Sequence, residues 1–339
     1  MPETPIALIL GCAGTSLSND EQQFFRDADP LGFILFARNC ETPDQVCELV
    51  FALRDSVGRA DAPVLIDQEG GRVQRLRPPH WRDAPPAKNF ADLYAYDQQG
   101  AREATFLNAL LMARDLAALG ISVDCAPVLD VPQSDAHDII GDRAHGINPP
   151  TVATLGRAVC EGLLAGGVMP VIKHVPGHGR ARADSHIELP VVNSTRAELQ
   201  ESDFPPFIDL ADQPWAMTAH VVYTALDENH PATTSAVIIK DIIREQLGFD
   251  GVLVSDDVGM KALDGDFKTR VQRALAAGCD VALHCSGDRD EMIAAAEGAG
   301  ALTELASERV ARSELLRQTT QRSEIASDAA LERLQELMA

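Results

Sequence analysis

Long apolar runs and positive charge are both scarce in this chain of 339 residues. No apolar run approaches the ~18 to 20 residues that a helix needs to cross a bilayer, so we expect no membrane association. Lys and Arg number 29 against 51 Asp and Glu, which gives a net charge of −22. Because proteins that bind nucleic acids gather basic residues on one face, we also expect no nucleic-acid partner. The acidic surface favours solubility and a monomer.

The seven cysteines form no CxxC pair and leave one over. This pattern argues against a zinc knuckle and a disulfide framework, and it favours a reducing compartment. Residues 8–12 resemble a lipoprotein cleavage site, but only about six apolar residues precede Cys12, and residues 1–5 carry Glu3 without Lys or Arg. A signal peptide has a basic start and a longer apolar stretch, so we expect a cytoplasmic protein.

Eight short apolar runs, rich in β-branched residues, alternate with longer segments of helical periodicity. The alternation predicts a parallel sheet, and the count of eight favours a closed (β/α)8 barrel of the TIM type over a doubly wound sheet. The dinucleotide-binding form of the doubly wound fold needs a G-x-G-x-x-G turn, which residues 11–14 do not supply. The expected strands are 6–10, 32–36, 63–67, 121–126, 169–173, 215–219, 252–256 and 280–284.

The helical segments carry recognisable start signals, such as Pro43 after Thr42 and a capping-box spacing from Thr195 to Glu198. Two final helical patterns follow no strand and should pack outside the barrel. Because no linker or shift in composition divides the chain, we expect residues 1–339 to form a single catalytic domain with a helical C-terminal extension at about 303–339. The other helices are expected near 19–28, 43–58, 100–119, 151–166, 195–211, 235–247, 266–278 and 288–301.

Ionisable residues stand at the ends of five expected strands. In a (β/α)8 barrel the functional sites lie at the C-terminal ends of the strands, so these side chains should meet at one rim. They are Asp67, Asp130, Lys173 with His174, His220, and Asp256 with Asp257.

The segment 173–186 holds three histidines, a lysine and an aspartate among glycines and alanines, a composition that builds a core poorly. The histidines and Asp184 could bind zinc or iron. However, their spacing matches no helical H-x-x-x-H pair, and the neighbouring Lys and Arg side chains would repel a metal. Lys173 could serve as a Schiff-base lysine, or it could donate hydrogen bonds.

Three strings of residues follow one another along the chain: DQEGGRV at 67–73, KHxPGHG at 173–179 continuing to DSH at 184–186, and SDD at 255–257. Together they resemble glycoside hydrolase family 3. Within that family they are similar to the single-domain bacterial β-N-acetylglucosaminidases of peptidoglycan recycling. The resemblance covers about residues 32–287 and implies an enzyme with no metal and no organic cofactor.

The resemblance also implies roles for individual residues. Asp256 matches the nucleophile, His186 the general acid/base, and Asp184 the partner of that histidine. The residues that match the N-acetylglucosamine subsite are Asp67, Arg75, Arg143, Lys173 and His174. Gly259 departs from the family, where Ser is common, and Asp142-Arg143-Ala144-His145 is unusual after Arg143; both departures concern loop contacts more than chemistry. We expect His178 to be a structural residue of its Pro-Gly-His-Gly turn.

The chemistry suits these residue types. A histidine with a pKa near 6.5 can give a proton to the leaving oxygen and later take one from water, and Asp184 would orient its ring. The small residues at 177–183 indicate a loop that brings His186 to the sugar when substrate is bound. Since side chains alternate along a strand, only one of Asp256 and Asp257 should face the sugar. Parity does not decide between them; the resemblance favours Asp256, which leaves Asp257 a structural role.

The expected activity is that of a retaining exo-β-N-acetylglucosaminidase. Its partner would be a small-molecule carbohydrate, an N-acetylglucosaminyl-1,6-anhydromuropeptide. Alternatives within the same class are a β-N-acetylglucosaminide phosphorylase and a broader β-glycosidase. From other classes, the chain could be a metal-dependent hydrolase that uses the histidine cluster, or an inactive sugar-binding protein.

Overall fold

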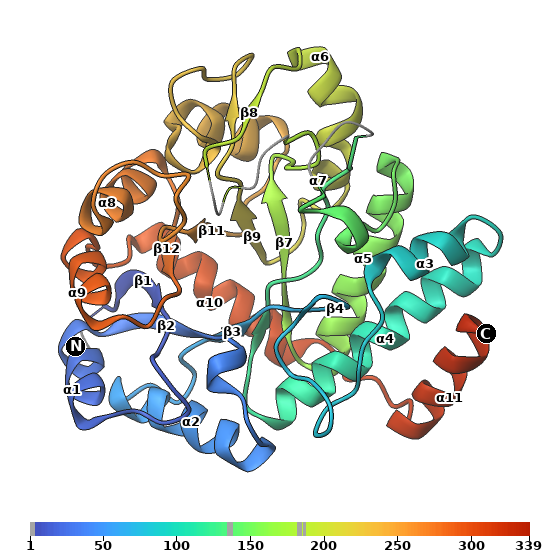
Figure 1. Cartoon of the computed structure of the whole chain (residues 1–339), viewed down its shortest axis with the longest axis horizontal. Coiled ribbons are helices and arrows are strands. Elements are labelled where there is room, and N and C mark those ends of the chain that lie inside the picture. Colours follow the sequence, from blue (N-terminus) through green and yellow to red (C-terminus); the bar gives the residue numbers. More distant parts are fainter. Residues whose placement is uncertain (1–3, 134–137, 182–184, 186–187) are drawn as a thin grey trace.

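Eight parallel strands close into a barrel in the computed structural model, which describes residues 4–133, 138–181, 185 and 188–339 (Figure 1). The hydrogen-bonded order around the barrel is β1-β12-β11-β9-β7-β6-β3-β2. Each of these strands lies within or overlaps an expected one, so the predicted (β/α)8 barrel is confirmed. Their bounds are β1 Ile6–Leu10, β2 Pro30–Leu35, β3 Val64–Ile66, β6 Val123–Asp124, β7 Met169–Val175, β9 Trp215–Thr218, β11 Val252–Asp257 and β12 Val281–His284.

Helices follow the strands along the chain and surround the barrel (Figure 1). The start signals act as expected: the Thr42 hydroxyl accepts from the Gln45 amide, and Thr195 and Glu198 form a reciprocal capping box. The helices are α1 Asn19–Ala28, α2 Pro43–Ser56, α4 Gln98–Ala118, α5 Pro149–Gly166, α8 Phe267–Ala277 and α9 Arg289–Gly298. The segment expected at 195–211 divides into α6 Arg196–Glu198, the π-helical η3 Leu199–Asp203 and α7 Pro205–Asp209, and the one at 235–247 is largely the π-helical η5 Ile238–Gln246.

The elements that were not expected include α3 Ala87–Tyr94, the antiparallel pair of β4 Gln68–Gly70 with β5 Val73–Gln74, and the parallel pair of β8 Val191–Val192 with β10 Val222–Tyr223. Strands of two or three residues are too short to show a period in the sequence.

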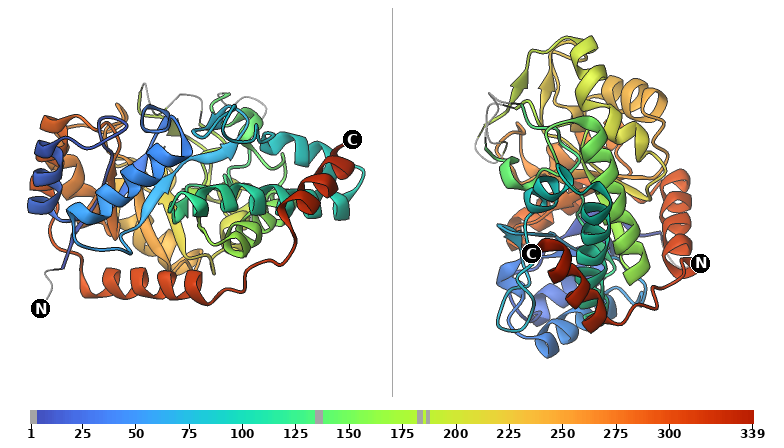
Figure 2. Two further views of the ribbon diagram at one scale, coloured as in Figure 1. Left: turned by 90° about the horizontal axis from the view of Figure 1, so that it is seen from below. Right: turned by 90° about the vertical axis from the view of Figure 1, so that its right-hand side faces the viewer.

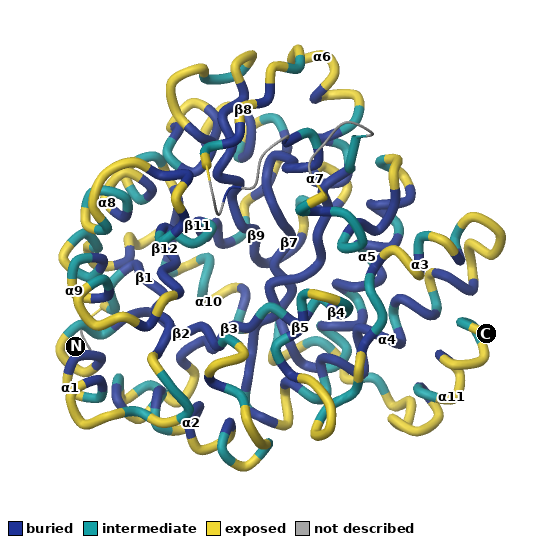
Figure 3. Tube along the Cα trace, viewed as in Figure 1, coloured by how far each residue is buried: buried dark blue, intermediate teal, exposed yellow. Residues whose placement is uncertain are grey.

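The core follows the alternation of side chains along each strand. In β11, Val252 and Val254 join the cluster inside the barrel, whereas Leu253 joins a cluster between the sheet and its helices. Figure 3 shows the strands buried and the outer surfaces of the helices exposed. Asp256 shares the sequence parity of Val252 and Val254 and stands near the end of the same strand.

The two C-terminal helices occupy different places. Helix α10, Glu304–Thr319, crosses the end of the barrel where the strands begin (Figure 2, left), and Ala306 joins the interior cluster. There Trp215 Nε1 donates to Ser313 Oγ at 3.0 Å. Helix α11, Ser327–Met338, packs outside the barrel against α3 and α4 through Ala330 and Leu334. Helix α10 therefore covers the amino-terminal end of the barrel.

Among the described residues, no helix combines the length and the apolar character that crossing a membrane requires.

Candidate active site

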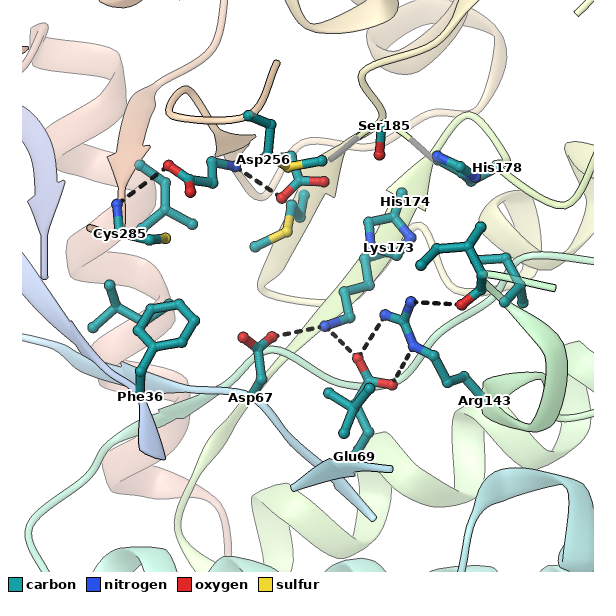
Figure 4. Close-up of a pocket in the computed structure, with 18 of the residues that line it drawn as sticks. Phe36, Asp67, Glu69, Arg143, Lys173, His174, His178, Ser185, Asp256 and Cys285 are labelled. Carbon is teal, nitrogen blue, oxygen red and sulfur yellow. Dashed lines mark hydrogen bonds and ion pairs between the residues drawn. The ribbon is translucent and has the colours of Figure 1, made fainter. Parts of the chain in front are cut away.

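A cavity of about 390 Å³ opens at the carboxyl end of the barrel. Every expected substrate-binding residue lines it, together with Asp256 (Figure 4). Apolar side chains complete the wall, among them Phe36, Met217 and Met260. The expected acid/base His186 and its partner Asp184 lie outside the described residues. Ser185, between them, is described and lines the cavity.

Lys173 lies between two carboxylates of this cavity, those of Asp67 and Glu69. Its ammonium is 2.9 Å from Asp67 Oδ1 and 2.6 Å from Glu69 Oε1, and its side chain is only 2% exposed. Burial lowers the pKa of a lysine, but the two carboxylates outweigh burial here and raise the pKa of Lys173 above its ordinary value. A Schiff-base lysine needs the opposite shift. Lys173 is therefore a charged hydrogen-bond donor.

Asp67 accepts a second bond, from Arg75 Nη2 at 3.0 Å. Burial opposes the ionisation of Asp67, but Lys173 and Arg75 outweigh it and hold the pKa of Asp67 well below its usual range. The Arg75 guanidinium also lies over the Phe36 ring, 5.0 Å from its centroid. The carboxylate of Asp67 is thus ionised and fixed from two sides.

Glu69 and Arg143 form a bidentate pair that the sequence did not indicate. Arg143 Nε and Nη2 donate to the two Glu69 oxygens, each at 2.8 Å, and Nη1 donates to the Ile139 carbonyl at 3.2 Å. Burial raises the pKa of Glu69, but Arg143 and Lys173 outweigh it and lower that pKa to about 2. Glu69 stands two residues after Asp67 in the DQEGGRV string. Within an extended segment this spacing places both carboxylates on one face, and that was the available signal.

Asp130 was expected at the rim but lies fully buried behind it. Its Oδ2 accepts from His174 Nδ1 at 2.7 Å, and its Oδ1 accepts from the backbone N–H groups of His174 and His178. Burial alone would raise the pKa of Asp130, but His174 outweighs it and lowers that pKa. Since Nδ1 of His174 is occupied, its Nε2 is the nitrogen left for other partners.

Asp256 and Asp257 both line the cavity, and which of them faces the sugar stays a prediction. The pairing of β11 with β12 shifts register between Val254 and Asp257, and this irregularity breaks the simple alternation of side chains. The Asp257 N–H donates to Asp256 Oδ1 at 2.8 Å. Asp257 Oδ1 in turn accepts from the N–H groups of Gly259 and Cys285, which agrees with a structural role.

The charge state of Asp256 follows from its surroundings. Burial raises the pKa of a carboxyl group, but attraction from His220 and His174 and the Asp257 N–H outweigh burial and lower the pKa of Asp256. Asp256 is therefore an ionised carboxylate on the opposite side of the cavity from Arg143 (Figure 4).

His220 was expected at the rim, but it is fully buried and is not among the residues that line the cavity. Its Nε2 donates to the Asp257 carbonyl at 2.9 Å, and its Nδ1 lies 2.7 Å from Thr233 Oγ1. Burial lowers the pKa of His220 below its ordinary value. Through its bond to the Asp257 carbonyl, His220 supports the strand end that carries Asp256.

This arrangement suits a sugar. Fixed carboxylates and cations bind hydroxyl groups, and a separate carboxylate is placed to act on a carbon atom. No group of three or more His, Cys, Asp or Glu residues that could hold a metal occurs within the described part of the chain.

Comparisons with known proteins agree with a site that binds a sugar. Residues 10–315 match the model of the glycosyl hydrolase family 3 N-terminal domain. A β-hexosaminidase of Thiobacillus denitrificans is 40% identical over 300 residues, which cover 85% of this chain and 80% of that protein. A β-hexosaminidase of Pseudomonas aeruginosa is 40% identical over 283 residues, covering 83% and 82%.

Solved structures give the same result. NagZ from Neisseria gonorrhoeae in complex with N-trifluoroacetyl-D-glucosamine superimposes with a TM-score of 0.88 at 29% identity, with full coverage of both chains. A family 3 β-N-acetylglucosaminidase from Paenibacillus gives 0.85 at 28% identity, covering 98% of this chain and 66% of that one. The chain therefore belongs to glycoside hydrolase family 3, as an enzyme of the β-N-acetylhexosaminidase type.

Proposed function

We propose that this enzyme is a retaining exo-β-N-acetylglucosaminidase that uses Asp256 as its nucleophile. The observation that carries the proposal is the position of Asp256, an ionised carboxylate at the end of β11, in the same cavity as the Asp67, Lys173 and Arg75 cluster. The cluster would hold the hydroxyl groups of the terminal sugar, and Asp256 would attack its anomeric carbon. A covalent glycosyl-enzyme follows, and its hydrolysis gives net retention.

Proton transfer is assigned to His186. This histidine would protonate the leaving oxygen and then take a proton from the attacking water, while Asp184 orients its ring and stabilises its charged form. The support is the DSH string, whose middle residue in the sequence, Ser185, lines the cavity. Among the described residues that line the cavity, the carboxylates Asp67, Glu69 and Asp257 are already engaged, which favours a histidine as the acid.

The proposed natural substrate is an N-acetylglucosaminyl-1,6-anhydromuropeptide from peptidoglycan recycling. Its support is the similarity of the three strings to recycling enzymes and the likeness to NagZ of Neisseria gonorrhoeae. The cavity, of about 390 Å³, fits an exo-acting enzyme that holds one terminal sugar. A monomeric enzyme in the cytoplasm, with residues 1–339 as one domain, belongs to the same proposal. Light scattering and cell fractionation test the oligomeric state and the location.

The experiment that tests the function is a panel of aryl β-glycosides together with purified anhydromuropeptide. We expect release of 4-nitrophenol from the β-N-acetylglucosaminide, and of N-acetylglucosamine from the muropeptide, with little turnover of the β-glucoside. Appearance of sugar 1-phosphate in phosphate buffer would assign a phosphorylase instead. The variant His186→Ala should retain more activity on the aryl glycoside than on the muropeptide, because a good leaving group needs no proton. Equal losses on both substrates would argue against acid catalysis by His186.

A further inference from the structure

His178 lies in the wall of the cavity, and its ring has a nitrogen to which no described residue is hydrogen-bonded. The side chain is 3% exposed and lines the cavity close to Ser185 (Figure 4). Its Nδ1 is buried without a hydrogen-bond partner. Buried polar atoms are almost always paired, so a histidine in the wall of a binding cavity whose Nδ1 has no partner is not kept there for a bond of that nitrogen within the protein.

The structural task of this turn does not need the imidazole. The backbone N–H of His178 donates to Asp130, the Tyr223 hydroxyl donates to the Gly177 carbonyl at 2.7 Å, and Gly179 packs directly against the Val131 backbone. The ring itself contributes an edge contact to His174, with centroids 5.7 Å apart. A phenyl ring could make the same edge contact. The nitrogens of His178 therefore call for a separate explanation.

The protonation state of His178 decides which bond it can make. Burial lowers its pKa to about 4, so the ring is neutral and carries one N–H. A buried lone pair without a partner costs less than a buried N–H without an acceptor, so the proton belongs on Nε2 rather than on the orphan Nδ1. The donor of His178 is thus the nitrogen at the outer end of the ring.

We propose that His178 is a substrate-contacting residue whose Nε2–H donates to an oxygen of the bound glycoside, on the side of the cavity where Ser185 lies. This role extends the proposed function, because it assumes that the ligand is a sugar. It gives His178 a part in binding that is distinct from the contacts proposed for Lys173 and Asp67.

The variant His178→Phe tests the contact, since it keeps a ring of similar size and loses both nitrogens. We expect kcat/KM for 4-nitrophenyl β-N-acetylglucosaminide to fall about tenfold, the size of one lost hydrogen bond in a dry site. The variant His178→Gln, whose amide nitrogen can take the place of Nε2, should recover most of the loss. The variant His145→Phe is the matched control: His145 is a buried histidine outside this cavity that bonds the Val128 carbonyl, so its loss should lower stability and leave KM unchanged.

Substrate analogues then identify the atom. If His178 contacts one substrate oxygen, the loss of kcat/KM caused by removing that oxygen and the loss caused by His178→Phe should not be additive. Additive losses for every deoxy and deacetylated analogue, or a His178→Phe enzyme within twofold of the parent, would overturn the proposal. Calorimetric binding of N-acetylglucosamine gives a readout that does not depend on turnover. If the parent enzyme binds the sugar and His178→Phe binds it more weakly, the contact is supported even if the proposed hydrolysis fails.

Discussion

Glu69 and Arg143 are joined by two parallel hydrogen bonds of 2.8 Å, and Lys173 approaches the same carboxylate at 2.6 Å. The Glu69 side chain is 7% exposed and that of Arg143 is 11% exposed. The guanidinium that the family resemblance assigns to the sugar is therefore held by a carboxylate from β4. Glu69 fixes two cations of the cavity at once.

The variant Glu69→Gln should lower the free energy of unfolding by about 3 kcal/mol at pH 7, because it leaves two buried cations without their shared carboxylate. It should also raise KM, since Arg143 and Lys173 lose their positions. Urea unfolding and steady-state kinetics measure both effects. The exposed pair Lys88 and Asp92 provides the control, and Asp92→Asn should change stability by no more than about 0.5 kcal/mol. Equal effects of the two substitutions would contradict the role of Glu69.

The free energy of unfolding should fall in acid because Glu69, which pairs with Arg143 and Lys173, becomes protonated. The pKa of Glu69 is lowered to about 2 in the fold, so the unfolded chain binds its proton first as the pH falls. The stabilisation is complete above pH ~4.5 and is lost on going down toward pH ~2. The free energy difference between the parent and Glu69→Gln should accordingly shrink over this range. A difference that stays constant from pH 6 to pH 3 would show that Glu69 is not ionised in the fold.

Most of the barrel could be predicted, because each strand and the helix that follows it have a recognisable pattern in the sequence. Each barrel strand is a run of apolar residues of the kind in β11, and a helix follows each of them, so position in the chain alone placed Asp67, Lys173 and Asp256 at one end. The burial of Asp130 and His220 behind the rim could not be predicted. Whether a polar residue at a strand end faces the cavity or turns behind it depends on partners distant in sequence, such as Thr233 for His220.

The pairing of Glu69 with Arg143 was hidden for the same reason, since 73 residues separate them along the chain. The cavity position of Asp257 depends on a register shift between β11 and β12, which no pattern in either strand reveals.

His220 should act as a positioning residue for the nucleophile. The variant His220→Phe keeps a ring but removes the donor to the Asp257 carbonyl, so we expect kcat to fall about tenfold or more with little change in KM. Thr233→Val removes the partner of Nδ1 together with the bonds of that hydroxyl to Thr218 and the Ala219 carbonyl, but keeps the His220 donor, so it should give a smaller loss of the same kind. A rise in KM with unchanged kcat would instead place His220 among the residues that bind substrate.

The covering of the barrel by α10 can be tested at Ser313. The variant Ser313→Ala leaves the buried Trp215 indole N–H without an acceptor, which should cost about 1 to 3 kcal/mol of unfolding free energy. Activity should not change, because this contact lies at the end of the barrel away from the cavity. Ser307→Ala on the same helix serves as the control. Loss of α10 alone before the rest of the chain, seen as two unfolding transitions, would contradict a single domain.

The central claim is that Asp256 forms a covalent bond to the anomeric carbon, and rescue by azide tests it most directly. In Asp256→Ala, azide can occupy the space of the missing carboxylate and attack a substrate with a good leaving group, such as the 2,4-dinitrophenyl β-N-acetylglucosaminide. The account predicts a very slow variant whose rate rises with azide, with the α-glycosyl azide as product by NMR. A β-glycosyl azide, no azide product at all, or the same rescue in Asp257→Ala instead would contradict it.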